Sequence, residues 1–404
     1  SESGRIGLKL QDQPVTDSGT APVRPGELVI VTGGGRGVTA ATAIALARAW
    51  HPLLVLLGRS PLPQQEPNWL EGLKEEAEIK RAILTNSREK LHPREIEEQY
   101  QAVISGRELR NTMSEIQAAG GMALYFNVDI RDAEGVSRLV DKLRAEHGPI
   151  RGIVHGAGVL ADRLIVDKTI EQFSHVYDTK VAGLKSLLKA TSVDELLFIA
   201  LFGSSTARLG RSGQLDYAVA NEVLNKLAQS EARNRTTCRT ISINWGPWDG
   251  GMVTPALKKL FAAEGIGLIS LTSGAELLVS ELSNQQGAVE LTVLAGISPA
   301  HLTATEPDRQ PQPLKEALRL TLNVDDFPFI NSHVIDGRAV LPMAMIVEWL
   351  AHAALHGNPG FRFHGFNDLR ICKGVTIDRN SNFVLKLMAG KARHQDAFYQ
   401  VPVE

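Results

Sequence analysis

The chain has 404 residues, of which 43% are hydrophobic and 22% are charged, and its formal net charge at pH 7 is −2. A globular chain of this length is expected to form more than one domain. The small net charge excludes the basic footprint of a nucleic-acid-binding protein, and no apolar run approaches the roughly 20 residues that a membrane helix requires. The two cysteines, Cys238 and Cys372, lack the spacing of a metal site, which predicts no bound metal and a reducing, cytoplasmic setting.

The chain begins with a polar stretch and a candidate nucleotide-binding loop. Residues 1–26 are rich in proline and glycine and predict a lead-in or linker. Within residues 27–50 a continuous apolar strand runs through a glycine-rich loop into a helix. Glycines let the backbone turn tightly and approach a pyrophosphate, whose charge the helix N-terminus favours. The loop therefore predicts a dinucleotide site, with the candidate residues Thr32, Gly33, Gly35, Arg36, Gly37 and Val38.

The second strand, within residues 52–60, ends in Arg59 and Ser60. A carboxylate at this position would bind the ribose diol of NAD, whereas an arginine accommodates the extra phosphate of NADP. Arg59 therefore predicts NADPH as the cofactor. An exposed arginine that merely ends a strand is the alternative.

Residues 61–112 depart from an open α/β pattern, in which the second strand leads into its helix within a few residues. Two charged segments with helical spacing occupy this stretch, and Pro93 suits the first turn of the second segment. We expect a surface helical insertion that packs against the domain or contacts another domain, with a merely solvated face as the alternative. The core fold is expected to resume at residues 114–121.

Two further strands follow. Residues 122–143 predict the third strand and its helix, with Asp129 and Ile130 just after the strand. Asp129 either binds a ligand there or caps the following helix. Residues 150–169 predict the fourth strand and a loop that contains Ala157 and Gly158.

The stretch at residues 196–232 carries the candidate catalytic groups. An apolar run predicts a buried parallel strand that ends near Ser204, where open α/β sheets place their active sites. Tyr217 and Asn221 are four residues apart and share one helix face. Hydride addition to a ketone leaves an alkoxide that needs a proton and hydrogen-bond donors. A phenol and a serine hydroxyl supply both, which predicts carbonyl reduction; a core tyrosine on an amphipathic helix is the alternative.

The remaining elements complete the first domain and begin a second. Residues 237–253 predict a sixth strand and a loop with Pro247 and Trp248, residues 257–282 a lid and a final helix, and residues 288–295 an edge strand. Residues 299–318 are rich in proline, threonine and charge and predict a linker.

Residues 27–298 resemble the short-chain dehydrogenase/reductase superfamily and, more narrowly, the ketoreductase domains of polyketide and polyunsaturated fatty acid synthases. Ser204 precedes Tyr217 by the thirteen positions typical of those domains, and Asn221 gives their Y-x-x-x-N pattern. Lys180 matches their lysine on an earlier helix. Thr39 departs from the pattern, because it stands where the family's glycine-rich loop has its last glycine.

The resemblance implies a role for each catalytic residue. Tyr217 would donate the proton, Ser204 would hold the carbonyl oxygen, and Lys180 would support Tyr217 and the cofactor ribose. Asn221 would position Lys180 and an ordered water.

The resemblance also implies contacts with the cofactor. Asp129 would bind the adenine amine, the backbone at Ala157 and Gly158 would pack against the nicotinamide ribose, and Pro247, Trp248 and Met252 would line the nicotinamide face. Together with the glycine-rich loop, the expected cofactor residues are Arg59, Ser60, Asp129, Ile130, Ala157, Gly158, Lys180, Tyr217, Pro247 and Trp248.

Two details of the sequence bear on the configuration of the product. Leu160-Ala161-Asp162 resembles the LDD signature of ketoreductases that give the D-configured alcohol, with Ala161 in place of the middle Asp. The competing tryptophan signature would require a Trp where Leu209 stands. Both details imply a D-alcohol.

Residues 319–404 resemble the start of a hot-dog-fold dehydratase from the same synthases. His333, Gly337 and Pro342 match H-x3-G-x4-P, and an apolar helix follows. In those enzymes the histidine removes an α-proton with help from an Asp on a second repeat. Because the sequence holds about one repeat, His333 is expected to be half of an active site or the remnant of an inactive one. A histidine ordered by local hydrogen bonds is the alternative.

These observations predict an α/β protein with a Rossmann-type doubly wound parallel sheet and a helical insertion, followed by a partial α+β hot-dog domain. The expected function is NADPH-dependent reduction of a β-ketoacyl thioester to the D-3-hydroxyacyl thioester. Acyl carrier protein and other synthase domains are the expected partners, with no nucleic acid and no membrane. A stand-alone short-chain alcohol dehydrogenase or ketone reductase and a non-catalytic docking module of a synthase are the alternatives.

Overall fold

The computed structural model describes Gln11 and residues 19–61, 66–87, 91–251, 253–296, 314–366, 369, 374–377, 382–395 and 398–404. Met252, Cys372 and most of the expected lead-in and linker lie outside these residues. The chain divides into two compact units, Ser1–Leu302 and Thr303–Glu404. No helix in the described ranges is long and apolar enough to cross a membrane.

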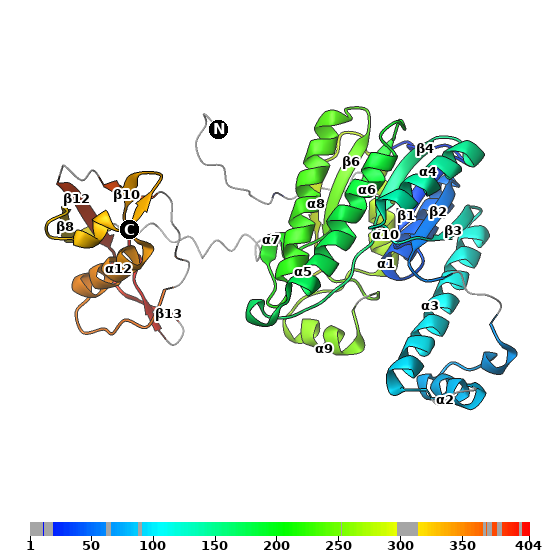
Figure 1. Ribbon diagram of the computed structural model, residues 1–404, viewed down its shortest axis with the longest axis horizontal. Coiled ribbons are helices and arrows are strands. Elements are labelled where there is room, and N and C mark those ends of the chain that lie inside the picture. The colour runs from blue at the N-terminus through cyan, green and yellow to red at the C-terminus, as the bar shows by residue number, and fades with distance from the viewer. Residues whose placement is uncertain are drawn as a thin grey trace. The chain divides into compact units, whose positions relative to one another are not determined.

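The first unit is built around a seven-stranded sheet in which each strand runs parallel to its neighbours (Figure 1). The strands are β1 (Leu28–Thr32), β2 (Leu53–Gly58), β3 (Met122–Asn127), β4 (Ile150–His155), β5 (Phe198–Ser204), β6 (Arg239–Trp245) and β7 (Glu290–Val293). Their order across the sheet is β3-β2-β1-β4-β5-β6-β7. This arrangement confirms the predicted Rossmann-type sheet.

Helices cover both faces of this sheet because successive side chains of a strand point to opposite faces. Val29 and Val31 of β1 belong to one apolar cluster, whereas Leu28 and Ile30 belong to the other. The first cluster is closed by α1 (Gly37–Trp50), α10 (Leu271–Ser283) and the end of α3 (Pro93–Ala118), and the second by α4 (Ala133–His147), α6 (Gly183–Ala190) and α8 (Leu215–Asn234).

The stretch at 61–112 contains a short 3-10 helix (Asn68–Leu70), α2 (Glu76–Asn86) and most of α3. Leu70, Ile79 and Ile83 form a small separate core here, against which the first half of α3 packs. In Figure 1, α3 runs from this outlying part to the edge of the sheet near β3. Leu109 and Ile116 of the same helix are buried in the main core. The core fold therefore does not resume separately at 114, since one continuous helix serves both the insertion and the crossover.

The second unit combines one long helix with short antiparallel strands. Trp349 and Leu350 of α12 (Met343–Gly357) are buried in its core with Leu387. The described strands form small separate sheets: β8 (Lys315–Leu322) with β12 (Phe383–Ala389), β9 (Val334–Ile335) with β10 (Arg338–Val340) and β11 (Thr376–Ile377), and β13 (Arg393–Gln395) with β14 (Phe398–Gln400). A hot-dog domain would wrap one sheet around its helix, so that prediction is not confirmed.

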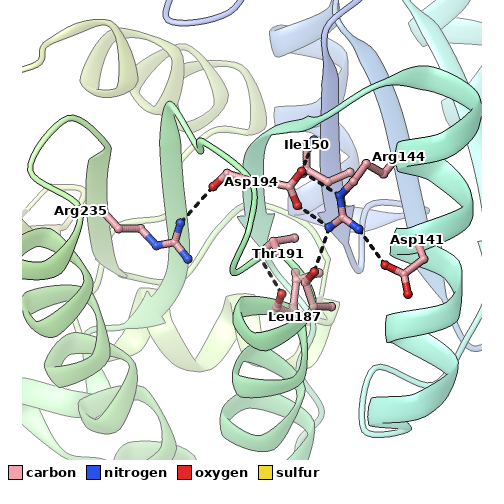
Figure 2. A network of polar contacts seen from close by, with 8 residues as sticks. Asp141, Arg144, Ile150, Leu187, Thr191, Asp194 and Arg235 are labelled. Carbon is pink, nitrogen blue, oxygen red and sulfur yellow. Dashed lines mark hydrogen bonds and ion pairs between the residues drawn. The ribbon is translucent and has the colours of Figure 1, made fainter.

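Asp194 joins three elements at the amino-terminal edge of the sheet in the first unit (Figure 2). Its carboxylate accepts hydrogen bonds from Nε and Nη2 of Arg144 at 3.2 and 2.6 Å and from the backbone nitrogen of Ile150 at 3.1 Å. Arg144 of α4 also donates to the carbonyl of Ala190 at the end of α6. The Asp194 side chain is 1% exposed, so one buried carboxylate fixes α4, α6 and the start of β4 together.

Replacing Asp194 by Ala is expected to lower the free energy of unfolding by about 3 kcal/mol, because Arg144 and the Ile150 amide lose a buried partner. Asp141 is the matched control, since it binds the same guanidinium at 2.7 Å but its side chain is 67% exposed. Asp141→Ala is expected to cost less than about 1 kcal/mol. Urea unfolding followed by circular dichroism measures both values, and equal losses would contradict this assignment.

Candidate active site

The carboxyl ends of β1, β4 and β5 meet at one edge of the sheet and carry Thr32, His155 and Ser204. Ligands of open α/β sheets bind at this edge. Every predicted catalytic residue of the first unit is found here, on β5, on α8 or on the turn before α6.

Lys180 and Tyr217 face each other beside β5. The Nζ of Lys180 lies 5.2 Å from the centroid of the Tyr217 ring and donates a hydrogen bond to the carbonyl of Phe202 at 2.8 Å. Lys180 is 2% exposed. A cation within about 6 Å of an aromatic face is attracted to it, so this lysine is placed to stabilise negative charge on the phenol.

Lys180 belongs to a π-helical turn, Asp178–Ala182, between α5 (Ile170–Tyr177) and α6. Such single π turns occur frequently at functional sites. The carbonyl of Lys180 accepts a hydrogen bond from Nε2 of His155 at 2.9 Å. Gly158 leaves room for the lysine stem, because a Cβ there would lie 3.0 Å from Lys180 Cε.

The tautomer of His155 follows from its partners. The hydroxyl of Thr32 accepts the backbone N–H of Ala157 at 3.1 Å and lies 2.9 Å from His155 Nδ1. The Lys180 carbonyl can only accept, so Nε2 carries the proton, and the Thr32 hydroxyl donates to Nδ1. Burial, with the Lys180 charge second, lowers the pKa of His155 to about 3. The imidazole is therefore neutral and structural, and it joins the glycine-rich loop to the lysine.

The Ser204 hydroxyl is available as a hydrogen-bond donor. Its Oγ accepts hydrogen bonds from the backbone nitrogen and the hydroxyl of Thr206, at 3.3 and 3.0 Å. Two donors fill the acceptor positions of a hydroxyl, so Ser204 acts as a donor toward the Tyr217 phenol, and its hydrogen bond lowers the pKa of that phenol. A substrate oxygen near Tyr217 is the kind of acceptor that this O–H suits.

The Tyr217 phenol lies in a partly buried setting. Burial raises the pKa of the phenol, and the charge of Asp162 raises it further, while hydrogen bonding from Asn221 and Ser204 lowers it. Asn221 is fully buried; its Nδ2 donates to the Tyr217 carbonyl at 2.7 Å, and its Oδ1 has no hydrogen-bond donor among the described residues. The structure thus pairs Asn221 with the backbone of Tyr217 rather than with Lys180.

The glycine-rich loop fits a phosphate-bearing cofactor. Gly33 and Gly37 have φ of 73° and 63°, a region that favours glycine. Helix α1 begins at Gly37 with no side-chain cap and no acidic residue in its first turn. Its first N–H groups therefore remain available for an anion.

The insertion helix α3 contacts this loop directly. Arg36 Nη1 donates to the Ser105 hydroxyl at 3.0 Å, and the Thr112 hydroxyl donates to the Gly35 carbonyl at 3.1 Å. Arg36 is predicted from the sequence to reach a phosphate, whereas its guanidinium is held by α3. Val38, the last residue of the expected loop, is partly buried near Gly251.

The Thr39 side chain packs closely against Gly156. Thr39 is 3% exposed, and a Cβ added at Gly156 would overlap its side chain. Gly156 carries no Cβ, so the close contact of α1 with the end of β4 is kept although Thr39 replaces the last glycine of the loop.

The other expected cofactor residues differ in how exposed they are. Arg59 and Ser60 are exposed after β2. The Asp129 carboxylate binds the Arg131 guanidinium, with Nη2 to Oδ2 at 2.6 Å, and this bond lowers its pKa to about 2. Ile130 is buried against Gly183.

The loop after β6 has its tryptophan ring buried in the core. Pro247 is partly buried, but Trp248 is 4% exposed, and its ring packs on Trp245 and on Gly274 of α10. The expectation that the Trp248 ring lines the nicotinamide face is therefore not supported by its burial.

Two features of the site are not predicted from the sequence. Thr206 orients Ser204 from the first turn of α7 (Thr206–Leu209). Lys168 and Asp216 form an ion pair at 2.7 Å beside Tyr217, with side chains 4% and 1% exposed. The only local signal for this pair is that Asp216 directly precedes Tyr217.

In the second unit, His333 lies next to the two-residue turn of Asp336 and Gly337, which have φ of 50° and 75°. Such values suit the tight turn of a β-hairpin. Nδ1 of His333 donates to the Val340 carbonyl at 2.8 Å, which leaves Nε2 as the unprotonated nitrogen of the neutral ring. Pro342 directly precedes α12.

Known proteins match the chain along much of its length. The sequence profile of the KR domain family matches residues 28–250. A polyunsaturated fatty acid synthase subunit of Thraustochytrium sp. is 35% identical over 371 residues, which are 89% of this chain and 13% of that protein. Polyketide synthase PksN of Bacillus subtilis is 33% identical over 165 residues, which are 38% of this chain and 3% of that synthase. The chain thus spans a small part of these relatives.

Solved structures share the fold. An N-terminal ketoreductase from the macrolactin assembly line superposes with a TM-score of 0.53 at 26% identity, over 70% of this chain and 47% of that one. A ketoreductase domain from the bacillaene assembly line gives 0.53 at 25% identity, over 69% of this chain and 58% of that one.

Gly156→Ala is expected to lower the free energy of unfolding by about 2 kcal/mol, because the added methyl group overpacks the contact with Thr39. Adding Thr39→Gly removes the clash and is expected to restore most of that loss. Urea unfolding of the two single variants and the double variant measures the coupling. Additive losses would show that the two residues do not compensate each other.

Burial lowers the pKa of Lys180 from 10.5 to about 7. Between these values the unfolded chain binds more protons than the folded chain, so the burial cost is full below pH 7 and falls as the pH rises. Lys180→Met is therefore expected to be more stable than the wild type at pH 6, with a gain about 3 kcal/mol smaller at pH 9. Urea unfolding at both pH values tests this, and a pH-independent difference would contradict it.

Proposed function

This chain belongs to the KR domain family, and from that premise we propose that its first unit reduces an acyl-carrier-protein-bound β-ketoacyl thioester with NADPH. The product is the D-3-hydroxyacyl thioester. The observation that carries the proposal is the group at the end of β5, where Lys180 lies over the ring of Tyr217 and the Ser204 hydroxyl, which accepts from Thr206, is left to act as a donor.

The bound nicotinamide cofactor would supply a hydride to the carbonyl carbon. Ser204 donates a hydrogen bond to the carbonyl oxygen and so holds it beside the phenol. The raised pKa of Tyr217 keeps the phenol protonated until an alkoxide of higher basicity forms, and the phenol then gives up its proton. Lys180, over the ring, stabilises the phenolate that results.

The position of Arg59 supports NADPH. Arg59 is exposed at the end of β2, on the strand next to the glycine-rich loop, and its charge helps to lower the pKa of Asp129. A guanidinium in this place suits the additional phosphate of NADPH.

The names of the relatives support the carrier-bound substrate. The relative from Thraustochytrium sp. belongs to a polyunsaturated fatty acid synthase, and it matches 89% of this chain. We therefore place the activity in a cytoplasmic multidomain synthase, with acyl carrier protein as the partner that delivers the substrate. The Leu160-Ala161-Asp162 segment supports the D-configuration.

A dehydratase-like role is the second candidate, for the second unit alone. The unprotonated Nε2 of His333 favours it, because that nitrogen can accept an α-proton. An acidic partner from another segment would have to complete this site.

Tyr217→Phe is expected to lower kcat/KM for a β-ketoacyl thioester by at least about a thousandfold, because the general acid is lost. NADPH oxidation measures the rate, and fluorescence titration measures NADPH binding, which is expected to persist. Tyr177→Phe is the matched control, since Tyr177 stacks on Phe173. A wild type that binds no NADPH would overturn the proposal in favour of a docking module.

A further inference from the structure

A buried ion pair lies directly beside the proton donor and has no part in the mechanism above. Lys168 Nζ and Asp216 Oδ2 are 2.7 Å apart, and the two side chains are 4% and 1% exposed. Lys168 follows a 3-10 turn, Ile165–Asp167, and Asp216 lies in the first turn of α8. The pair therefore joins the loop after β4 to the start of the catalytic helix.

Each residue of the pair also makes a hydrogen bond to a backbone group. Lys168 Nζ donates a second hydrogen bond, at 2.7 Å, to the carbonyl of Ala161. Asp216 Oδ1 accepts the backbone N–H of Tyr217 at 2.9 Å. A continuous set of hydrogen bonds thus runs from Ala161 through both charges to Tyr217.

Two further hydrogen bonds join residues 162–163 to residues 213–214, just before α8. The backbone N–H of Arg163 donates to the Gly213 carbonyl at 2.9 Å, and Gln214 Nε2 donates to Asp162 Oδ2 at 2.8 Å. The charge of Asp162 acts on the Tyr217 phenol, whose pKa it raises. Residues 160–164, which we call the 160–164 wall, are therefore tied to the residues before α8 and lie near enough to Tyr217 for the charge of Asp162 to act on its phenol.

Stability alone does not account for a buried charge pair. Removing two charges from water costs several kcal/mol per ion, and well-packed apolar residues in their place are often as stable or more stable. What the apolar residues cannot supply is the directed link from Ala161 to Tyr217. The exposed pair of Lys226 and Glu222 on the same helix shows the contrast, since its side chains are 53% and 31% exposed.

We propose that the Lys168–Asp216 pair is a positioning device that fixes the 160–164 wall against Tyr217 and so determines which face of the ketone receives the hydride. The inference rests on the ketoreductase function proposed above. A ketone whose oxygen is held by Ser204 and Tyr217 can present either face by exchanging its two arms. A rigid wall on one side admits one arrangement, and a displacement of about 1 Å near reacting atoms changes rates by as much as a hundredfold.

The test is the enantiomer ratio of the β-hydroxyacyl product, measured by chiral chromatography for the wild type, Lys168→Met and Asp216→Asn. We expect the ratio to fall about tenfold or more in both variants. The dissociation constant of NADPH, which a general loss of structure would raise, is expected to stay within about twofold of the wild type.

Lys226→Met is the matched control, because it breaks an exposed ion pair of α8 and is expected to keep the ratio unchanged. If a single variant does not fold, Lys168→Met/Asp216→Leu replaces it, since it leaves no unpaired buried charge; it is expected to show the same fall. A folded variant with the wild-type ratio, or a wild type without stereochemical preference, would overturn the inference alone. A wild type that reduces no β-ketoacyl thioester would overturn the proposed function and this inference with it.

Discussion

The hydrogen bonds of one buried imidazole connect the parts of the active site. His155, at the end of β4, binds Thr32 through Nδ1 and the Lys180 carbonyl through Nε2. Thr32 begins the glycine-rich loop, and Lys180 lies over the ring of Tyr217. Because the pKa of His155 is about 3, the ring keeps one charge state and one tautomer at physiological pH. The glycine-rich loop and Tyr217 are therefore positioned by the same neutral group.

Charge is buried for different purposes at the two edges of the sheet. At the amino-terminal edge, Asp194 satisfies Arg144 and a backbone amide and joins α4 and α6 to β4. At the carboxyl edge, Lys180 is buried beside Tyr217 and its pKa is lowered to about 7, which is unfavourable for folding near neutral pH. An enzyme tolerates such a cost where the charged form is needed for the reaction.

Much of the fold and the position of the candidate catalytic residues could be predicted from local sequence. Apolar strands with helical segments between them give a doubly wound sheet, and the position of Ser204 at a strand end places it at the ligand-binding edge. Other features depend on contacts between distant segments and could not be predicted from local sequence. Arg36 is held by Ser105, the Trp248 ring is packed on α10, and α3 is one helix across the expected end of the insertion. The short strands of the second unit form separate small sheets for the same reason.

By itself the sequence determined the parallel strands of a nucleotide-binding sheet, the glycine-rich loop and the spacing of Ser204, Tyr217 and Asn221, because each follows from the period of a strand or helix. Only the tertiary structure decided that Gly156 makes room for Thr39, that Thr206 donates to the Ser204 hydroxyl, and that Lys168 meets Asp216. These contacts join residues through packing and burial across the fold. Whether a lysine is a solvated surface cation or a buried anchor depends on what surrounds it, and its local sequence does not specify those surroundings.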